Sequence, residues 1–177
     1  MTRPSNATPR QETRSVPDKV VSEETAKQLV GAAQARGESV VFTCGCFDVL
    51  HIGHIRSLFE ARQLGDHLII GLNTDASVRA LKGPGRPLFP DTERAEVLAA
   101  LEPIDWIVII GDHTMDRILD FVRPDLFVKG TDYSVETIPE RQTVLDYGGR
   151  LAIVGDAKTR SSRQFTVERR NVEERPE

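Results

Sequence analysis

Five short apolar runs recur along the chain, and they limit the possible folds more than any other feature of the sequence. The runs cover residues 39–43, 68–72, 106–110, 126–129 and 151–154. Each is continuously apolar and does not alternate with polar residues. Continuous runs of this length are typical of parallel strands covered on both faces. The sequence therefore predicts a parallel sheet that is buried between two layers.

Helical stretches lie between these runs, and one more precedes the first. They cover residues 23–35, 52–64, 93–101, 115–122 and 140–147. Strands that alternate with helices at this spacing predict right-handed βαβ units. The expected fold class is therefore α/β, with a single domain built on a doubly wound sheet of about five parallel strands. Ligands bind such sheets at the carboxyl ends of the strands, so polar residues directly after the strands are candidates for a site.

Composition excludes several classes of protein. The formal net charge of −4 provides no general positive field for nucleic acid. No apolar run approaches the roughly 18 residues of a membrane span, and the polar N-terminus lacks the apolar segment of a secretory signal. Both cysteines lie in one short motif, which excludes a disulfide framework and makes a reducing cytoplasm the expected location. We expect neither a nucleic-acid nor a membrane partner.

Both ends of the chain are expected to form tails. Residues 1–20 are polar and contain three prolines, a composition typical of disorder. Residues 169–177 are rich in Glu and Arg and are expected to be flexible. Residues 21–168 remain as the predicted domain, including its leading helix.

The stretch Thr43–His54 (TCGCFDVLHIGH) contains two cysteines, two histidines and an aspartate. Cys44 and Cys46 flank a single residue, which is not the usual C-x₂₋₄-C spacing of a zinc site, and no second cluster follows. A redox C-x-x-C is also absent. We therefore interpret the cysteines as small residues that pack under a tight turn.

The same stretch has the pattern of a phosphate site where a strand meets a helix. Gly45 allows a ligand to approach the backbone closely. Gly53 stands at the start of a helix, where free N–H groups and the helix dipole favour anions. His51 and His54 are three residues apart, so they can project to one side and donate hydrogen bonds to phosphate oxygens.

These residues resemble a known signature. Gly45-Cys46-Phe47-Asp48, followed by His51-Ile52-Gly53-His54, is similar to the GxFDxxHxGH motif of the cytidylyltransferase-like nucleotidyltransferases. The resemblance implies a Rossmann-like fold and an enzyme that joins an NTP to a phosphorylated small molecule, releasing pyrophosphate.

Further stretches are similar to the heptose 1-phosphate adenylyltransferases, which make ADP-heptose for bacterial lipopolysaccharide. They are residues 72–87, 91–108 and 124–133. In many bacteria this domain is fused to a sugar kinase, which this sequence lacks, so the stand-alone form is expected.

The implied reaction is in-line attack of a sugar-phosphate oxygen on the α-phosphorus of the NTP. The nucleophile is already an anion at neutral pH, so catalysis should come from positioning and charge stabilisation without a general base. The resemblance gives this catalytic role to His51 and His54. The resemblance also gives a catalytic role to Lys82, in a Gly- and Pro-rich loop, although a lysine there is more commonly a solvated surface residue.

The resemblance assigns two further sets of residues. The nucleotide-binding set is Thr43, Gly45, Cys46, Phe47, Gly53, Lys129, Gly130, Asp132, Tyr133, Arg160, Ser161 and Ser162. The substrate-binding set is Asp48, Asn73, Asp75, Arg86 and Arg94. Other interpretations stay open for three of these residues: Asp75 as a helix cap, Arg94 as a helix salt bridge and Tyr133 as rim packing.

Two departures from the family pattern bear on the substrates. Arg163 replaces the last threonine of a Ser-Thr-Thr run that holds phosphates in relatives. Residues 138–142 (IPERQ) replace a loop of Gly and small residues, near the expected acceptor. This loop and Asp48 are the places where we expect acceptor selectivity to be set.

ATP and D-glycero-D-manno-heptose 1-phosphate are the leading substrates. Mg²⁺ is expected to bind through the nucleotide phosphates, without a metal cage made by the protein. The family also implies a homodimer. One alternative is a cytidylyltransferase that uses CTP with glycerol 3-phosphate or another polyol phosphate. A second is a non-catalytic nucleotide-binding protein.

Overall fold

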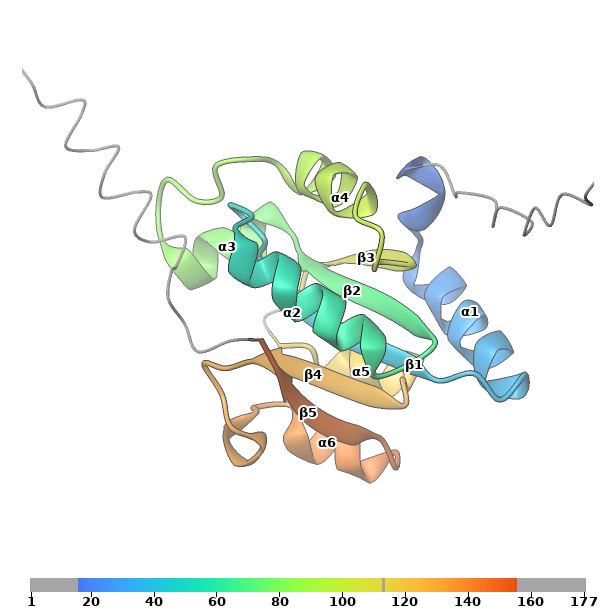
Figure 1. Ribbon diagram of the computed structural model, residues 1–177. Helices are drawn as coiled ribbons and strands as arrows, with labels where there is room; N and C mark the ends of the chain where they lie inside the picture. Colours follow the sequence, from blue (N-terminus) through green and yellow to red (C-terminus); the bar gives the residue numbers. More distant parts are fainter. Residues whose placement is uncertain (1–15, 113, 156–177) are drawn as a thin grey trace, which may run out of the picture.

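A five-stranded parallel sheet forms the centre of the computed structural model, which describes residues 16–112 and 114–155 (Figure 1). The strands are β1 (Val40–Gly45), β2 (His67–Asn73), β3 (Trp106–Ile110), β4 (Leu126–Gly130) and β5 (Arg150–Val154). Their order is β3-β2-β1-β4-β5, and every neighbouring pair is parallel. The predicted fold class is therefore confirmed, and each apolar run lies in a strand.

Five of the helices in the described residues follow the predicted stretches, and α3 (Asp75–Lys82) is an addition to them. The helices are α1 (Glu23–Ala35), α2 (Ile52–Gln63), α3, α4 (Asp91–Ala99), α5 (Asp116–Val122) and α6 (Arg141–Asp146), with short 3₁₀ turns η1 (Val16–Lys19) and η2 (Val135–Thr137). Ser22 begins α1 because its side chain accepts a hydrogen bond from the Thr25 N–H at 3.1 Å.

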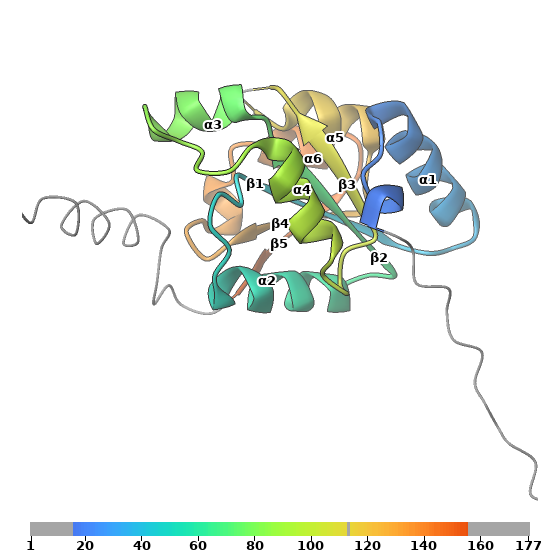
Figure 2. The ribbon, with the colours of Figure 1, turned by 90° about the horizontal axis from the view of Figure 1, so that it is seen from above.

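Two layers of helices cover the sheet (Figures 1 and 2). On one face, residues of α1, α5 and α6 pack with Phe42 and Phe127. On the other, residues of α2 and α4 pack with Val41 and Ile70. Successive strand residues point to opposite faces. Both sets must therefore be apolar, which explains the continuous runs in the sequence.

The chain changes direction across the sheet at β1. The connection from β1 leads to β2 on one side, whereas β4 and β5 lie on the other. Thr43 of β1 pairs with Val128 of β4, and the Thr43 hydroxyl donates to the Val128 carbonyl at 3.0 Å. Loops that leave the carboxyl ends of β1 and β4 diverge at such a point and open a crevice for a ligand.

The expected N-terminal tail is wrong for its last five residues. Val16–Lys19 form the turn η1, and Val20 makes a parallel bridge with Ile107. The Lys19 ammonium also donates to the Leu101 carbonyl at 3.0 Å. The segment therefore adds to the edge of the sheet beside β3. Residues 1–15, and the expected tail at 169–177, lie outside the described residues.

No helix in the described ranges has both the length and the apolar character needed to cross a bilayer.

Candidate active site

A cavity of about 620 Å³ lies at the carboxyl ends of β1, β2 and β4. It brings together residues that the sequence places far apart. The predicted site residues on its wall are Thr43, Gly45, Cys46, Phe47, Asp48, His54, Asn73, Lys82, Lys129, Gly130, Asp132 and Tyr133. The crevice at the switch point of the sheet therefore coincides with the predicted nucleotide site.

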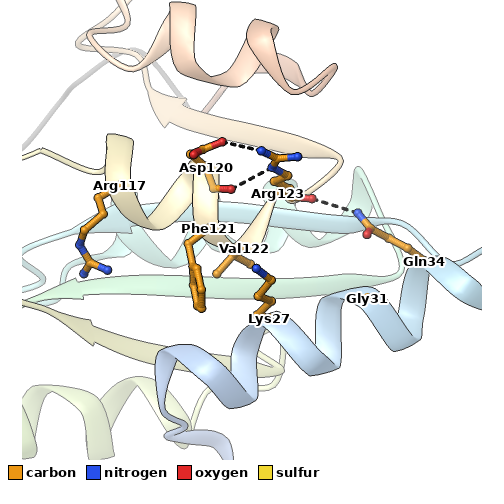
Figure 3. Close-up of a pocket in the computed structure, with 8 residues that line it drawn as sticks. All are labelled: Lys27, Gly31, Gln34, Arg117, Asp120, Phe121, Val122 and Arg123. Carbon is orange, nitrogen blue, oxygen red and sulfur yellow. Dashed lines mark hydrogen bonds and ion pairs between the residues drawn. The ribbon is translucent and has the colours of Figure 1, made fainter.

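A second hollow, of about 760 Å³, lies between α1 and α5 (Figure 3). Its charged groups interact within the protein. Arg117 donates to Glu23 at 2.7 Å, Arg123 to Asp120 at 3.0 Å, and the Lys27 ammonium lies 4.2 Å from the centre of the Phe121 ring. None of the predicted site residues lines this hollow, so we place the active site in the smaller cavity.

His51 and His54 form a stacked pair at the start of α2. Their ring centres are 3.9 Å apart, with 26° between the ring planes. The His51 backbone N–H donates to Nδ1 of His54 at 3.4 Å. When the His54 imidazole is neutral, this contact makes Nδ1 an acceptor and leaves the proton on Nε2. Nε2 can then donate to a phosphate oxygen in the cavity.

Both glycines of the motif make room for rings of the motif. A Cβ on Gly53 would lie 3.0 Å from Nδ1 of His51, and a Cβ on Gly45 would lie 3.2 Å from Cε2 of Phe47. Phe47 itself has a positive φ of 43°, and its ring centre lies 5.4 Å from that of His54. The glycines therefore leave room for the His51 and Phe47 rings, in addition to any approach of an anion to the backbone.

Asp48 holds the loop that follows α3. Its side chain is fully buried and forms an ion pair with Arg86. The second carboxylate oxygen accepts the Leu88 backbone N–H at 2.6 Å. Asp48 and Arg86 were predicted to bind substrate. The structure uses their charged groups to fix the loop against the β1–α2 connection, which is a positioning role.

Arg94 joins three segments around the cavity. Its guanidinium donates to Asp75 at 2.7 Å, to the Cys46 carbonyl at 2.5 Å and to the Phe89 carbonyl at 3.0 Å. Its side chain is 2% exposed, so the salt-bridge interpretation describes Arg94 better than substrate binding. Asp75 is not the cap of α3, because the Thr74 side chain accepts from the Ser77 N–H.

Lys129 lies between β1 and the loop before α6. Its ammonium is 3.2 Å from Sγ of Cys44 and 3.2 Å from Oε1 of Glu140. Burial opposes the charged form of Lys129, but Cys44 and Glu140 favour it and leave its pKa raised. Burial raises the pKa of the Cys44 thiol, so Lys129 is a cation beside a neutral thiol and a carboxylate.

Lys82 supplies a second cation to the cavity. It is exposed at the end of α3, and Gly83 ends the helix with a φ of 92° that favours glycine.

The neighbouring Cys46 thiol has a raised pKa, mainly because of burial, and lies 3.9 Å from Oδ1 of Asn73. Burial therefore disfavours the thiolate of Cys46, as expected for a packing residue.

The predicted second phosphate segment lies outside the described residues. Arg160, Ser161 and Ser162, with the departure at Arg163, are outside the described ranges. Gly155, the last described residue, donates to Glu60 of α2 at 2.6 Å. A Cβ on Gly155 would lie 2.2 Å from Oγ of Ser57. The chain therefore leaves β5 beside the first turns of the histidine helix.

Nine residues that line the cavity were not in the predicted site. They are Cys44, Ser57, Leu58, Leu81, Thr114, Met115, Pro139, Glu140 and Val154. Thr114 and Met115 come soon after β3, so their place at the carboxyl end of a strand was an available signal. Glu140 lies in the 138–142 loop, where the departure from the family pattern, with its added Glu140 and Arg141, pointed to a different acceptor.

Comparisons with known proteins agree with this geometry. The family model described as cytidylyltransferase-like matches residues 42–170. A bifunctional protein HldE from Syntrophotalea carbinolica is 46% identical over 144 residues, which are 81% of this chain and 29% of that protein. A bifunctional protein HldE from Pseudomonas paraeruginosa is 50% identical over 123 residues, which are 70% of this chain and 26% of that protein. The chain thus spans less than a third of these relatives.

A solved structure supports the fold. It is described as the lipopolysaccharide core biosynthesis protein from Thermoplasma volcanium GSS1. It matches with a TM-score of 0.59 over 69% of this chain and 100% of that chain, at 24% sequence identity.

Proposed function

The chain belongs to the cytidylyltransferase-like family of nucleotidyltransferases, and from that membership we propose that it transfers a nucleoside monophosphate from an NTP to a sugar phosphate. ATP and D-glycero-D-manno-heptose 1-phosphate are the proposed substrates, and pyrophosphate is the second product. The similarity to the HldE proteins supports this choice of acceptor.

One observation carries the proposal: His54, Lys82 and Lys129 come from three different elements and line one cavity. A triphosphate needs several donors and cations that converge from different directions, because its charge is spread over many oxygens. A cavity at the switch point of a parallel sheet can also hold the nucleoside and the acceptor together.

The proposed catalysis is by positioning and charge. The acceptor phosphate is an anionic nucleophile, so no residue has to remove a proton. His54 donates through Nε2 to oxygens that gain charge as the α-phosphorus becomes pentacoordinate. His51 holds the His54 ring by stacking and by its backbone N–H. Lys82 stabilises the phosphates as charge moves to the leaving pyrophosphate, and Lys129 adds positive charge to the same cavity.

A divalent metal would enter with the nucleotide. In the described part of the chain, no group of three or more His, Cys, Asp or Glu side chains could hold a metal ion. We therefore propose that Mg²⁺ is held by phosphate oxygens, as is usual for this ion, where it would neutralise part of the triphosphate charge.

Pyrophosphate release with each of the four NTPs and a panel of sugar and polyol phosphates tests the proposal. We expect turnover with ATP and heptose 1-phosphate. Turnover with CTP and glycerol 3-phosphate alone would instead support the cytidylyltransferase alternative. If no pair gives pyrophosphate while NTPs still bind, the protein is a binding protein and the proposed activity is wrong.

The replacement His54→Ala tests the catalytic role. Loss of one preorganised donor should lower kcat by about 10²–10³-fold, while NTP binding stays measurable by calorimetry. Full activity in His54→Ala would contradict the assignment of His54 to the transition state.

A further inference from the structure

Glu140 is a buried carboxylate on the wall of the cavity, and the protein uses only one of its oxygens. The residue is 4% exposed and directly precedes α6. Its Oε1 accepts a hydrogen bond from the Lys129 ammonium at 3.2 Å. Among the described residues, no donor lies within hydrogen-bonding distance of the buried Oε2. Buried carboxylate oxygens are normally hydrogen-bonded, so Oε2 needs a partner from elsewhere.

The local structure accounts for only one oxygen of this carboxylate, through the ion pair with Lys129. Glu140 occupies the cap position of α6, but its side chain makes no capping hydrogen bond. Lys129 already interacts with Oε1, and this contact fixes the orientation of the carboxylate. The terminal torsion of a glutamate is soft. A small rotation can therefore turn an oxygen of Glu140 toward a ligand while Lys129 keeps its contact.

The charge of Glu140 limits the kind of ligand. A carboxylate repels phosphate, so the phosphates belong beside His54 and Lys82, the other groups on the wall. The group that meets Glu140 must donate a hydrogen bond and must not be an anion. Sugar hydroxyls have both properties.

We propose that Glu140 is a specificity-determining residue that accepts a hydrogen bond from a sugar hydroxyl of a substrate. The proposal rests on the proposed function, because both of its substrates contain sugar hydroxyls. One source is the ribose of the NTP, because Lys129 and Tyr133, which line the cavity with Glu140, belong to the predicted nucleotide-binding set. The other source is the acceptor sugar.

Binding measurements that combine Glu140→Gln with deoxy ligands test the proposal. One arm compares ATP with 2′-deoxy-ATP and 3′-deoxy-ATP, and the other compares heptose 1-phosphate with its monodeoxy analogues. In the unmodified protein, removing the recognised hydroxyl should weaken binding about 10- to 100-fold, as expected for a hydrogen bond to a charged group. The Glu140→Gln variant should bind the parent ligand more weakly than the unmodified protein does. In this variant, the deoxy ligand should bind almost as tightly as its parent.

The arm in which this discrimination disappears identifies the source of the hydroxyl. Glu136→Gln is the matched control, because Glu136 is an exposed carboxylate in the neighbouring η2 turn and does not line the cavity. It should bind every ligand as the unmodified protein does. Thermal unfolding of both variants separates a change in recognition from a loss of fold.

Two results would overturn the proposal. One is equal discrimination in the unmodified protein and in Glu140→Gln. The other needs no variant: the unmodified protein binds every deoxy analogue as tightly as its parent in both arms. Because binding is measured without turnover, lost pyrophosphate release with intact discrimination overturns only the proposed function. Turnover without discrimination overturns only the role of Glu140.

Discussion

His54 can donate to a phosphate only if its ring is held and its proton lies on Nε2. At the scale of single residues, the structure meets both conditions with neighbours in the same short stretch. The His51 ring stacks on His54, and the His51 N–H occupies Nδ1. Gly53 leaves just enough room for the His51 ring. Contacts within the motif therefore fix both the position of the His54 ring and the nitrogen that carries its proton.

Replacing Gly53 with Ala should separate stability from activity. Alanine is favoured over glycine within a helix by about 0.5–1 kcal/mol, so the melting temperature should not fall. The new Cβ would lie 3.0 Å from the His51 ring and displace it by a few tenths of an ångström. Because misplacement by about 1 Å costs about 100-fold in rate, we expect kcat to fall roughly tenfold.

Gly31→Ala is the control for this prediction. Gly31 lies in α1, and a Cβ there would meet no atom within 4 Å. Its kcat should stay unchanged, whereas a Gly53→Ala enzyme with unchanged kcat would show that the ring stack is not needed.

Salt bridges at the scale of elements hold the cavity wall together. The loop between α3 and α4 is fastened to the β1–α2 connection by Asp48 and Arg86. Arg94 of α4 is fastened to Asp75 of α3 and to the Cys46 carbonyl. Lys82 stands at the end of α3, directly before this loop. The position of a proposed catalytic cation therefore depends on these ion pairs.

Replacing Asp48 with Ala should strongly destabilise the protein. It removes the carboxylate partner of Arg86, whose side chain is only 10% exposed. Loss of one partner of a buried pair typically costs about 3–5 kcal/mol in free energy of unfolding, which urea denaturation can measure. Glu96→Ala, at an exposed site on α4, should change stability by no more than about 0.5 kcal/mol. Equal effects of the two changes would contradict the anchoring role.

Acid should weaken the contact between the start of β1 and the start of β2. Hydrogen bonds from Arg36 and His67 lower the pKa of Glu38 from 4.5 to about 2. A carboxylate with a lowered pKa in the folded state stabilises the protein above its ordinary pKa. This stability should be lost as the pH falls from 4.5 toward 2. An NMR titration should place the Glu38 midpoint near 2, and a midpoint near 4.5 would contradict the contact.

The stability difference between the unmodified protein and Glu38→Gln should shrink over the same pH range. Glu24→Gln makes the same change of charge at an exposed position on α1 and should not reproduce that pH dependence.

Elements were easier to predict than their contacts. The five strands could be read from local apolar runs, and the histidine motif from twelve consecutive residues. The contact between Cys44 and Lys129 could not be predicted from the sequence, because these residues are 85 positions apart and meet only through the pairing of β1 with β4. The same holds for the link between Cys46 and Arg94, which are 48 positions apart. The residue types in a sequence indicate the kind of chemistry, but only the packed structure shows which charged side chains pair with one another inside the protein.

On the scale of the whole molecule, two of the hollows in the described structure are candidates for the binding site. The larger one, between α1 and α5, contains charges that are paired with one another (Figure 3). The smaller one lies at the switch point of the sheet and gathers His54, Lys82 and Lys129. The arrangement of charge, not volume, is therefore our reason for proposing that an anionic ligand binds in the smaller cavity.

Ligand-induced stabilisation can test that choice. Mg-ATP at about 100 times its Kd should raise the free energy of unfolding by about 2.7 kcal/mol, because it binds only the folded state. Lys82→Ala should reduce the accompanying rise in melting temperature. Lys27→Ala, in the hollow between α1 and α5, should leave it unchanged. The reverse result would place the nucleotide in the other hollow.

The central place of β1 also has a consequence for folding. This strand pairs with β2 through residues 27 positions apart, such as Thr43 and Ile70, and with β4 through residues 85 positions apart, such as Thr43 and Val128. Closing the longer loop costs about 1 kcal/mol more in chain entropy, and distant contacts of this kind slow folding. Lys129 reaches the histidine motif only after that closure. The rate at which nucleotide binding returns during refolding should therefore report the docking of β4 onto β1, and not the earlier collapse of the chain.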